Sequence, residues 1–237
     1  TMNFILSRWW ADMSIIVTGT IGGLTDLGTI SLHLATMWPT PITVIEADPD
    51  GGRLAARHNW ELRPGLAELA AHVRTPATST LDPQSLRRTY RNDVSVVVAP
   101  PSAEQVIAAL SIIAPHTGTL DQVLGTDVII NVGRVRPNTP ASDIMRAANT
   151  RLLISRTDLD DVVALVHRQP LLKELGEWQV LAAGGRYKID ELAKAIEWPV
   201  IADLLPSDRR SSAALKLTIA KIATAHQSIE LVDRAVA

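Results

Sequence analysis

Short apolar runs rich in β-branched residues alternate with helical stretches along the whole chain, and this alternation constrains the fold more than any other feature. The runs Ser-Ile-Ile-Val-Thr and Val-Ser-Val-Val-Val-Ala are apolar nearly throughout, which is typical of strands buried on both faces of a parallel sheet. The pattern predicts seven strands, at Ser14–Thr18, Ile42–Ala47, Val94–Ala99, Asp127–Asn131, Arg151–Ser155, Trp178–Ala182 and Val200–Leu204.

Helices are predicted between these strands, and several of them begin at capping residues. Ser102 is followed three residues later by Gln105, which is the pattern of a capping box. The predicted helices span Leu27–Thr36, Arg53–His58, Gly65–His72, Pro83–Arg91, Ala103–Ala114, Ala141–Ala148, Leu159–Glu174, Ile189–Ile196 and Asp208–Ala235. Repeated strand–helix units form α/β folds, so we predict a three-layer, doubly wound, mostly parallel sheet of about seven strands.

Length and composition fit one compact domain. The chain has 237 residues, of which 46% are hydrophobic and 20% charged, enough to bury one large core. We see neither an internal repeat nor a low-complexity linker, and therefore predict an N-terminal extension at 1–12 and a single domain at 13–237. A net charge of −2 does not favour a nucleic-acid partner, and the absence of cysteine excludes a thiolate metal site and a disulfide scaffold. The histidines are scattered without metal-ligand spacing, so no metal site is predicted.

A glycine-rich segment follows the first predicted strand and leads into a helix. Glycines at 19, 22, 23 and 28 allow backbone N–H groups to face a ligand, and a helix N-terminus favours an anion. A working phosphate loop also needs a lysine, and none lies between Met13 and Arg53. The alternative is a plain strand–turn–helix without a ligand.

This segment resembles the deviant Walker A loop of the MinD/ParA family, Lys-Gly-Gly-Val-Gly-Lys-Ser/Thr-Thr followed by an Asn/His-Leu-Ala helix. The match rests on Thr29 and on Leu32-His33-Leu34-Ala35. In the resulting register the signature lysine falls on Gly22 and the first glycine on Gly23. The P-loop glycine, lysine and magnesium hydroxyl fall on Asp26, Leu27 and Gly28. The resemblance implies a P-loop NTPase-like fold whose triphosphate site has lost its lysine and gained a carboxylate.

Other landmarks of the family are partly kept. Glu46-Ala47-Asp48-Pro49 resembles the second acidic motif, Asp-Ala-Asp-Pro, whose acids serve magnesium and the attacking water. Asn131 occupies the position of the family's Walker B aspartate. Ala183 occupies the position at which relatives often have an asparagine that recognises adenine. A local alternative is open for two of these motifs. The acidic loop after the second strand would only cap the next helix, and Asn131 would only hydrogen-bond the neighbouring loop. Leu205-Pro206-Ser207-Asp208 resembles the Ile-Pro segment of the seventh strand.

The function implied by the resemblance is that of a degenerate MinD/ParA-like scaffold or positioning factor without catalytic residues. We interpret Gly22, Gly23, Gly28, Thr29 and Asp48 as vestigial nucleotide-site positions. No cofactor is expected. The alternative is a protein that binds ATP and magnesium weakly, with a positive side chain from a partner, and hydrolyses ATP slowly in partitioning or polar localisation. The segments 46–57 and 63–66, and Gly133-Arg134 before a Pro-rich turn, resemble actinobacterial MinD-like proteins, some of them similar to TadZ/CpaE localisation factors of pilus secretion systems.

Partners and location follow from the same resemblance. We expect a homodimer, or a complex with a related ATPase or secretion-system protein, in the cytoplasm. Contact with the inner-membrane surface or a location at the cell pole is a further expectation, through Trp9-Trp10 or the last helix, whose apolar stripe includes Leu215, Ile219 and Ile222. For that helix we expect packing on the sheet before membrane contact, with a dimer contact as the next alternative. The remaining tryptophans are predicted to be packing residues, and Asp158, Asp160 and Asp161 a solvated helix start.

Overall fold

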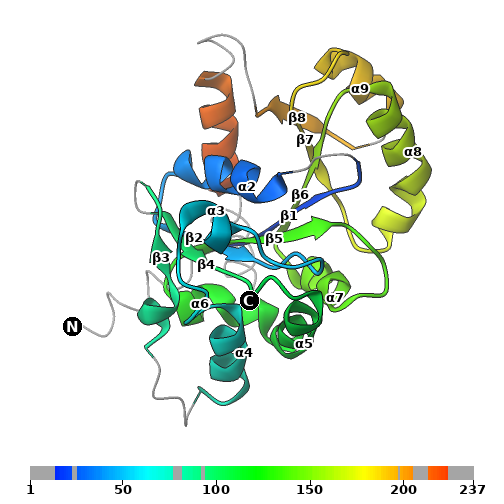
Figure 1. Cartoon of the computed structure of the whole chain (residues 1–237). Coiled ribbons are helices and arrows are strands. Elements are labelled where there is room, and N and C mark those ends of the chain that lie inside the picture. The colour runs from blue at the N-terminus through cyan, green and yellow to red at the C-terminus, as the bar shows by residue number, and fades with distance from the viewer. Residues whose placement is uncertain are drawn as a thin grey trace, which may run out of the picture.

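A mostly parallel eight-stranded sheet organises the chain, in the order β3-β4-β2-β5-β1-β6-β7-β8 (Figure 1). The computed structural model describes residues 14–22, 26–76, 82–91, 94–196, 198–204 and 213–223. Neighbouring strands pair in parallel except β3 and β4. The strands are β1 (Ile15–Thr20), β2 (Ile42–Glu46), β3 (Arg88–Thr89), β4 (Val94–Val97), β5 (Asp127–Arg134), β6 (Thr150–Ser155), β7 (Gln179–Ala182) and β8 (Val200–Asp203).

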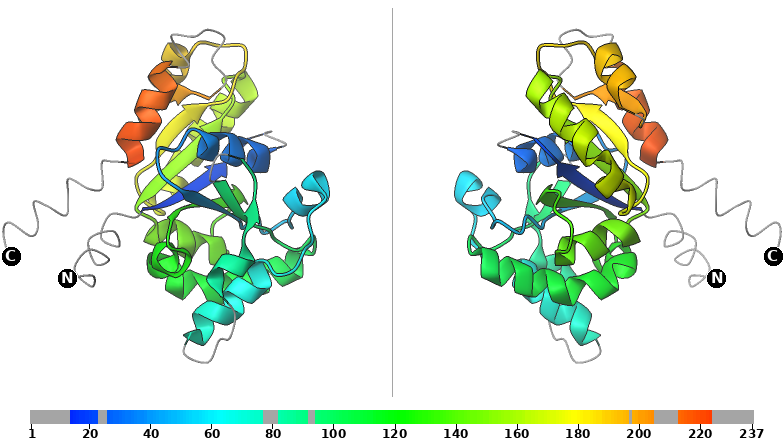
Figure 2. Two further views of the ribbon diagram at one scale, coloured as in Figure 1. Left: turned by 90° about the vertical axis from the view of Figure 1, so that its left-hand side faces the viewer. Right: turned by 90° about the vertical axis from the view of Figure 1, so that its right-hand side faces the viewer.

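Helices cover both faces of this sheet, so the predicted three-layer α/β fold is confirmed (Figure 2). The α-helices are α2 (Leu27–Thr36), α3 (Leu54–His58), α4 (Leu66–Arg74), α5 (Ala103–Ile113), α6 (Leu120–Leu124), α7 (Pro140–Ala147), α8 (Leu159–Lys173) and α9 (Ile189–Ala195). The 3₁₀ helices are η2 (Pro83–Leu86) and η3 (Ala114–Thr119), and a further α-helix covers 213–223. No helix within these described ranges is long and apolar enough to cross a membrane.

Successive side chains along each strand pack alternately into two separate hydrophobic cores, one on each face of the sheet. Ile15 and Val17 of β1 belong to one core and Ile16 to the other, as the two-residue period of a strand requires. The first core holds α4, α5, α6, α7, α8 and α9. The second holds α2, α3 and the 213–223 helix, whose Leu215 and Ile219 are buried against the sheet. The described part of the last predicted helix therefore packs on the sheet.

The sequence prediction differs from the structure mainly in two segments of the chain, at 83–91 and at 114–124. The helix predicted at Pro83–Arg91 is wrong: the chain forms the short helix η2 and then β3, which pairs antiparallel with β4 at the sheet edge. Arg88 stabilises that edge by donating to the carbonyl oxygen of Arg63 at 2.8 Å. The helices η3 and α6 were not predicted. Trp38, Trp178 and Trp198 are buried as expected, whereas Trp9-Trp10 and the whole of 1–13 lie outside the described residues.

Sheet topology places the carboxyl ends of three strands side by side. β5 lies between β1 and β2, so the chain crosses over β5 when it passes from β1 through α2 to β2. In doubly wound sheets, ligands bind beyond the carboxyl ends of the strands at such a crossover. The residues that follow β1, β2 and β5 are therefore the first place to look for a functional site.

Candidate functional site

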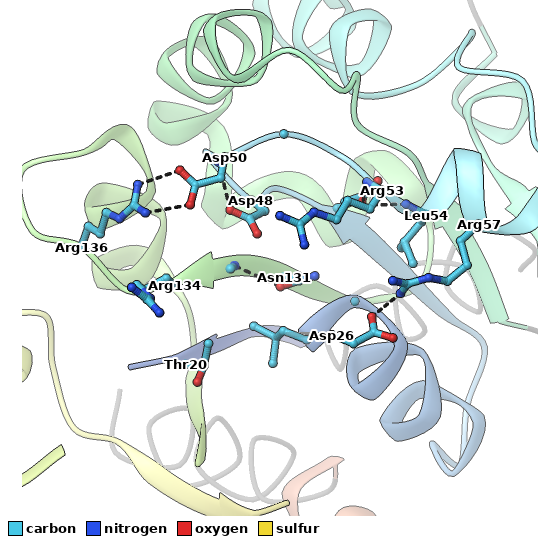
Figure 3. Close-up of a pocket in the computed structure, with 15 residues that line it drawn as sticks. Thr20, Asp26, Asp48, Asp50, Arg53, Leu54, Arg57, Asn131, Arg134 and Arg136 are labelled. Atoms are coloured by element: carbon cyan, nitrogen blue, oxygen red, sulfur yellow. Dashed lines mark hydrogen bonds and ion pairs between the residues drawn. The ribbon is translucent and has the colours of Figure 1, made fainter. Parts of the chain in front are cut away.

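A pocket of about 390 Å³ opens at the carboxyl ends of β1, β2 and β5 (Figure 3). It is bounded by the start of α2, by the loop from β2 into α3, and by the residues at the end of β5. Its lining residues are Thr20, Asp26, Leu27, Gly28, Glu46, Asp48, Asp50, Gly51, Arg53, Leu54, Arg57, Asn131, Gly133, Arg134 and Arg136. Of the five predicted site residues, Gly28 and Asp48 line the pocket, Thr29 and Gly22 are not among its lining residues, and Gly23 is outside the described residues.

The N-terminus of α2 is capped by a carboxylate of the chain itself. The side chain of Asp26 accepts a hydrogen bond from the backbone amide of Thr29 at 3.1 Å. Arg57 of α3 forms an ion pair with the same carboxylate and donates to the Thr29 hydroxyl at 2.9 Å. Burial opposes ionisation of Asp26, but the hydrogen bonds from Thr29 and Arg57 outweigh it and lower its pKa. A negative group thus already occupies the place where a helix N-terminus attracts an anion.

Two apolar contacts complete this side of the pocket. Leu27, at the position of the family's P-loop lysine, is the first residue of α2 and is buried in the second core. Gly28 faces Leu54 of α3, because a β-carbon on Gly28 would lie 3.1 Å from Leu54 Cδ2. A side chain at position 28 would therefore have to displace the leucine.

Glu46 at the end of β2 is used within the fold. Its Oε1 accepts from the backbone amides of Arg53 at 2.6 Å and Leu54 at 3.0 Å, and its Oε2 from that of Ala99 at 3.1 Å. The side chain is buried, and burial raises its pKa despite these bonds. The acidic position therefore caps the start of α3, which was the local alternative for this motif.

Asp48 and Asn131 both line the pocket, and both lie close to Gly133. Gly133, with φ +64°, lies directly under the Asp48 carboxylate, and any β-carbon there would overlap it. Asn131 accepts from the Gly133 amide at 3.0 Å through Oδ1, and both residues belong to β5, so this bond is made within the strand and not to a neighbouring loop. Burial raises the pKa of Asp48, which also accepts from the Asp50 amide at 3.0 Å. No group of carboxylates and histidines in the described ranges could hold a metal ion.

Four arginines surround these acids, and three of them were missed from the sequence. Arg136 binds Asp50 through two hydrogen bonds of 2.7 Å, and Arg57 binds Asp26. Arg134 donates to the carbonyl oxygen of Gly22 at 3.3 Å, and Arg53 extends into the pocket near Asp48 (Figure 3). The alternative prediction takes a positive side chain from a partner, whereas these four arginines belong to this chain. Arg134 and Arg136 could have been found, because they follow a predicted strand at the edge of the sheet where sites form.

Gly22 lies against α8, away from the pocket lining. A β-carbon on Gly22 would collide with the carboxylate of Asp161. Asp161 is only 6% exposed, so the solvated helix start predicted there is wrong for this residue. It is buried because β1 and β6 are neighbours and the loops at their ends pack together. In the register of the sequence resemblance Gly22 stands at the signature lysine, and the structure leaves no room for a β-carbon there unless Asp161 moves.

Several solved structures are similar to this chain in fold. The cell division ATPase MinD of Pyrococcus furiosus is 14% identical with a TM-score of 0.63, covering 86% of this chain and 96% of that chain. A ParA family ATPase of Chlorobium tepidum is 13% identical with a TM-score of 0.64, covering 94% and 98%. This chain has the fold of the MinD and ParA ATPases.

A further solved neighbour has the same fold. An ATP complex of a McdA variant from Cyanothece is 17% identical with a TM-score of 0.55, covering 93% of both chains. No protein-family model and no curated protein sequence matches the chain. At these identities the likeness describes the fold, and the chemistry has to be argued from the residues that line the pocket.

Proposed function

We propose that this chain is a MinD/ParA-like protein that does not hydrolyse ATP and acts as a scaffold or positioning factor through contacts with other proteins. One observation carries the proposal: the carboxylate of Asp26 caps α2 and is held there by Arg57. A triphosphate at this helix start would meet that carboxylate. Two unit charges about 4 Å apart repel by about 1–4 kcal/mol at effective dielectrics between those of water and a protein surface.

Three further residues support the same proposal. Leu27 offers a buried apolar side chain where the family has its P-loop lysine. Glu46 has its oxygens bonded to backbone amides, so it is committed to capping α3. Asn131 has no charge with which to organise water on magnesium. The fold around the site is kept, while the residue types that would bind and activate a triphosphate are replaced.

The test is nucleotide binding measured by calorimetry on the whole chain with ATP and magnesium. We expect no binding at millimolar nucleotide and no phosphate release above buffer. Asp26→Gly with Leu27→Lys removes the carboxylate and supplies a cation, and should gain measurable binding over the native chain. Asp26→Gly alone is the matched control for loss of the cap. Tight binding or turnover by the native chain would contradict the proposal.

A second candidate function rests on the four arginines. Among the described residues, neither Arg53 nor Arg134 forms an ion pair with a carboxylate, and both line the pocket. They could hold the phosphates of a nucleotide in place of the missing lysine, giving weak binding without the helix N-terminus. In that case the native chain binds ATP, and Arg53→Ala with Arg134→Ala abolishes binding while Asp26→Gly does not improve it.

The positioning role takes its support from the fold. The solved neighbours include a septum site-determining protein bound to Mg-ADP and a plasmid partition protein. We expect a fluorescent fusion of this chain to concentrate at a discrete place in its own cells, such as the pole or the inner-membrane surface. Asp48→Asn should leave that pattern unchanged if no nucleotide chemistry is needed. A diffuse signal, or a pattern lost in Asp48→Asn, would contradict the role.

A further inference from the structure

Most charged side chains of the pocket are already bonded within the chain. Arg57 binds Asp26, and Arg136 binds Asp50 through two hydrogen bonds of 2.7 Å. Glu46 accepts from three backbone amides. A ligand could use any of these groups only by breaking a bond that holds the loops around the pocket together.

Two cations of the pocket, Arg53 and Arg134, are not committed in this way. Over the described ranges of the chain neither has a carboxylate within ion-pair distance, and both side chains are exposed. Arg53 directly precedes α3 and extends toward Asp48, while Arg134 ends β5 (Figure 3). A guanidinium presents its N–H donors in a planar fork that matches the geometry of a carboxylate. These two side chains are therefore available to acidic groups from outside.

The charge balance of the pocket limits how acidic a ligand can be. Four arginines and four carboxylates are among its described lining residues. Two arginine–aspartate pairs cancel, and Glu46 is bonded to amides at the start of α3, so Arg53, Arg134 and Asp48 remain. Two positive charges and one negative charge suit one or two carboxylates, whereas the several charges of a triphosphate exceed them.

The walls of the pocket are polar, which argues against a small molecule as the occupant. Within the described lining, Leu27 and Leu54 are the two apolar side chains, and no aromatic ring is present. Pockets that hold a small molecule are lined mainly by hydrophobic and aromatic side chains. A segment of another protein makes further contacts outside the pocket, so here it needs only partners for its charged groups.

We propose that the pocket is the docking site for an acidic segment of a partner protein, whose carboxylates bind Arg53 and Arg134. This docking site rests on the scaffold role proposed above, and it names the kind of partner that the scaffold holds. Each exposed ion pair adds little affinity, but charged pairs determine orientation and the choice of partner. A short acidic peptide therefore binds weakly, and its affinity falls as the salt concentration rises.

NMR titration of the isotope-labelled full chain tests the docking site directly. The probe is the blocked peptide acetyl-Glu-Glu-Glu-amide, and acetyl-Gln-Gln-Gln-amide is its neutral control. We expect the side-chain Nε–Hε signals of Arg53 and Arg134 to shift with the acidic peptide and to stay in place with the neutral one. Arg168, an exposed arginine of α8 outside the pocket, is the internal control. No shift at the two pocket arginines, or an equal shift at Arg168, overturns the proposal.

Removal of the two guanidiniums tests their contribution to affinity. Arg53→Ala combined with Arg134→Ala should lower the affinity for the acidic peptide several-fold, while Arg168→Ala should leave it unchanged. All three side chains are exposed, and circular dichroism checks that the variants fold. A double variant that folds and retains the native affinity overturns the assigned contacts.

A third arginine can be released to increase the affinity. Asp50→Asn frees the guanidinium of Arg136, which is 45% exposed, and removes a repelling carboxylate, so the acidic peptide should bind more tightly. Asp143→Asn is the matched control, because it frees Arg146 outside this pocket. An equal gain in the two variants would show binding to any free arginine and would overturn the site.

Two further ligands separate this proposal from its alternatives. Glutarate offers carboxylates without a peptide, and glutarate binding as tight as that of the peptide would overturn a protein segment as the occupant. ATP binding by the native chain would contradict the proposed function, whether or not the peptide binds. Absence of both ATP binding and peptide binding overturns the docking site alone.

Discussion

Gly22 and Asp161 lie so close together that a β-carbon on the glycine would overlap the aspartate carboxylate. The contact joins the loop after β1 to the first turn of α8, and Asp161 is buried there. Arg134 fixes the same loop from the other side, through the carbonyl oxygen of Gly22 at 3.3 Å. The two contacts hold the loop at Gly22 in place, with no room for a larger side chain unless Asp161 moves.

Replacement of Gly22 by alanine should destabilise the fold. The added methyl group has to push Asp161 aside, and overpacking of this kind costs about 1–3 kcal/mol in the free energy of unfolding. Urea unfolding measures it. In an Asp161→Ala background the same change should cost less, because the clashing oxygens are gone. Gly118→Ala is the control, since no atom lies within 4 Å of a β-carbon at Gly118, and an equal loss there would contradict the clash.

The Asp26 cap should contribute to stability in a pH-dependent way. Asp26→Ala is expected to cost about 1 kcal/mol at neutral pH, as the loss of an N-cap does. Because the pKa of Asp26 is lowered in the folded state, its contribution is present above the unfolded value and lost as the pH falls through the folded one. Urea unfolding of both proteins at neutral and acidic pH measures the gap. A gap that does not narrow in acid would show that the carboxylate is not the cap.

Glu46 should have the opposite pH dependence. Burial raises the pKa of Glu46 above its ordinary value of 4.5, so the folded chain retains its proton to higher pH than the unfolded chain does. The free energy of unfolding therefore decreases as the pH rises from about 4.5 through the raised pKa. Glu46→Gln cannot titrate and should lose this part of the slope. Parallel pH profiles for the two proteins would argue against a raised pKa.

Asp127 should be among the most important polar side chains for stability. It accepts from the Trp38 indole at 2.8 Å and the Thr40 hydroxyl at 2.5 Å through Oδ2, and from the Ser14 amide at 2.8 Å through Oδ1. Asp127→Ala leaves the buried donors of Trp38 and Ser14 unpaired and should cost about 2–4 kcal/mol. Asp143→Ala removes an exposed partner of Arg146 and should cost under about 1 kcal/mol. Thermal unfolding compares the two, and similar losses would contradict the ranking.

Elements with a long apolar pattern could be predicted from the sequence, and short ones could not. The runs around Ile16 and Val96 are buried strands, as their composition indicates. β3 has only two residues, Arg88 and Thr89, too few for any periodicity, and it exists because β4 offers a free edge. The segment 83–91 was therefore assigned to a single helix that the chain does not form.

The candidate site was predicted in part. Gly28 and Asp48 line the pocket because each follows a predicted strand at the same sheet edge. Arg57 was missed because it reaches Asp26 from α3, 31 residues further along the chain. Nothing in the local sequence distinguishes it from other surface arginines.

The sequence by itself determined the strand–helix order, the parallel sheet and the residue types at the start of α2. These follow from local periodicity and from identities such as Asp26 and Leu27, which depend only on near neighbours in the chain. The tertiary structure alone decided that Asp26 would be held by Arg57, that Glu46 would cap α3, and that Asp161 would close over Gly22. Each of these contacts joins groups whose distance depends on how the loops after β1, β2 and β6 meet at one edge of the sheet, and that arrangement has no local signal.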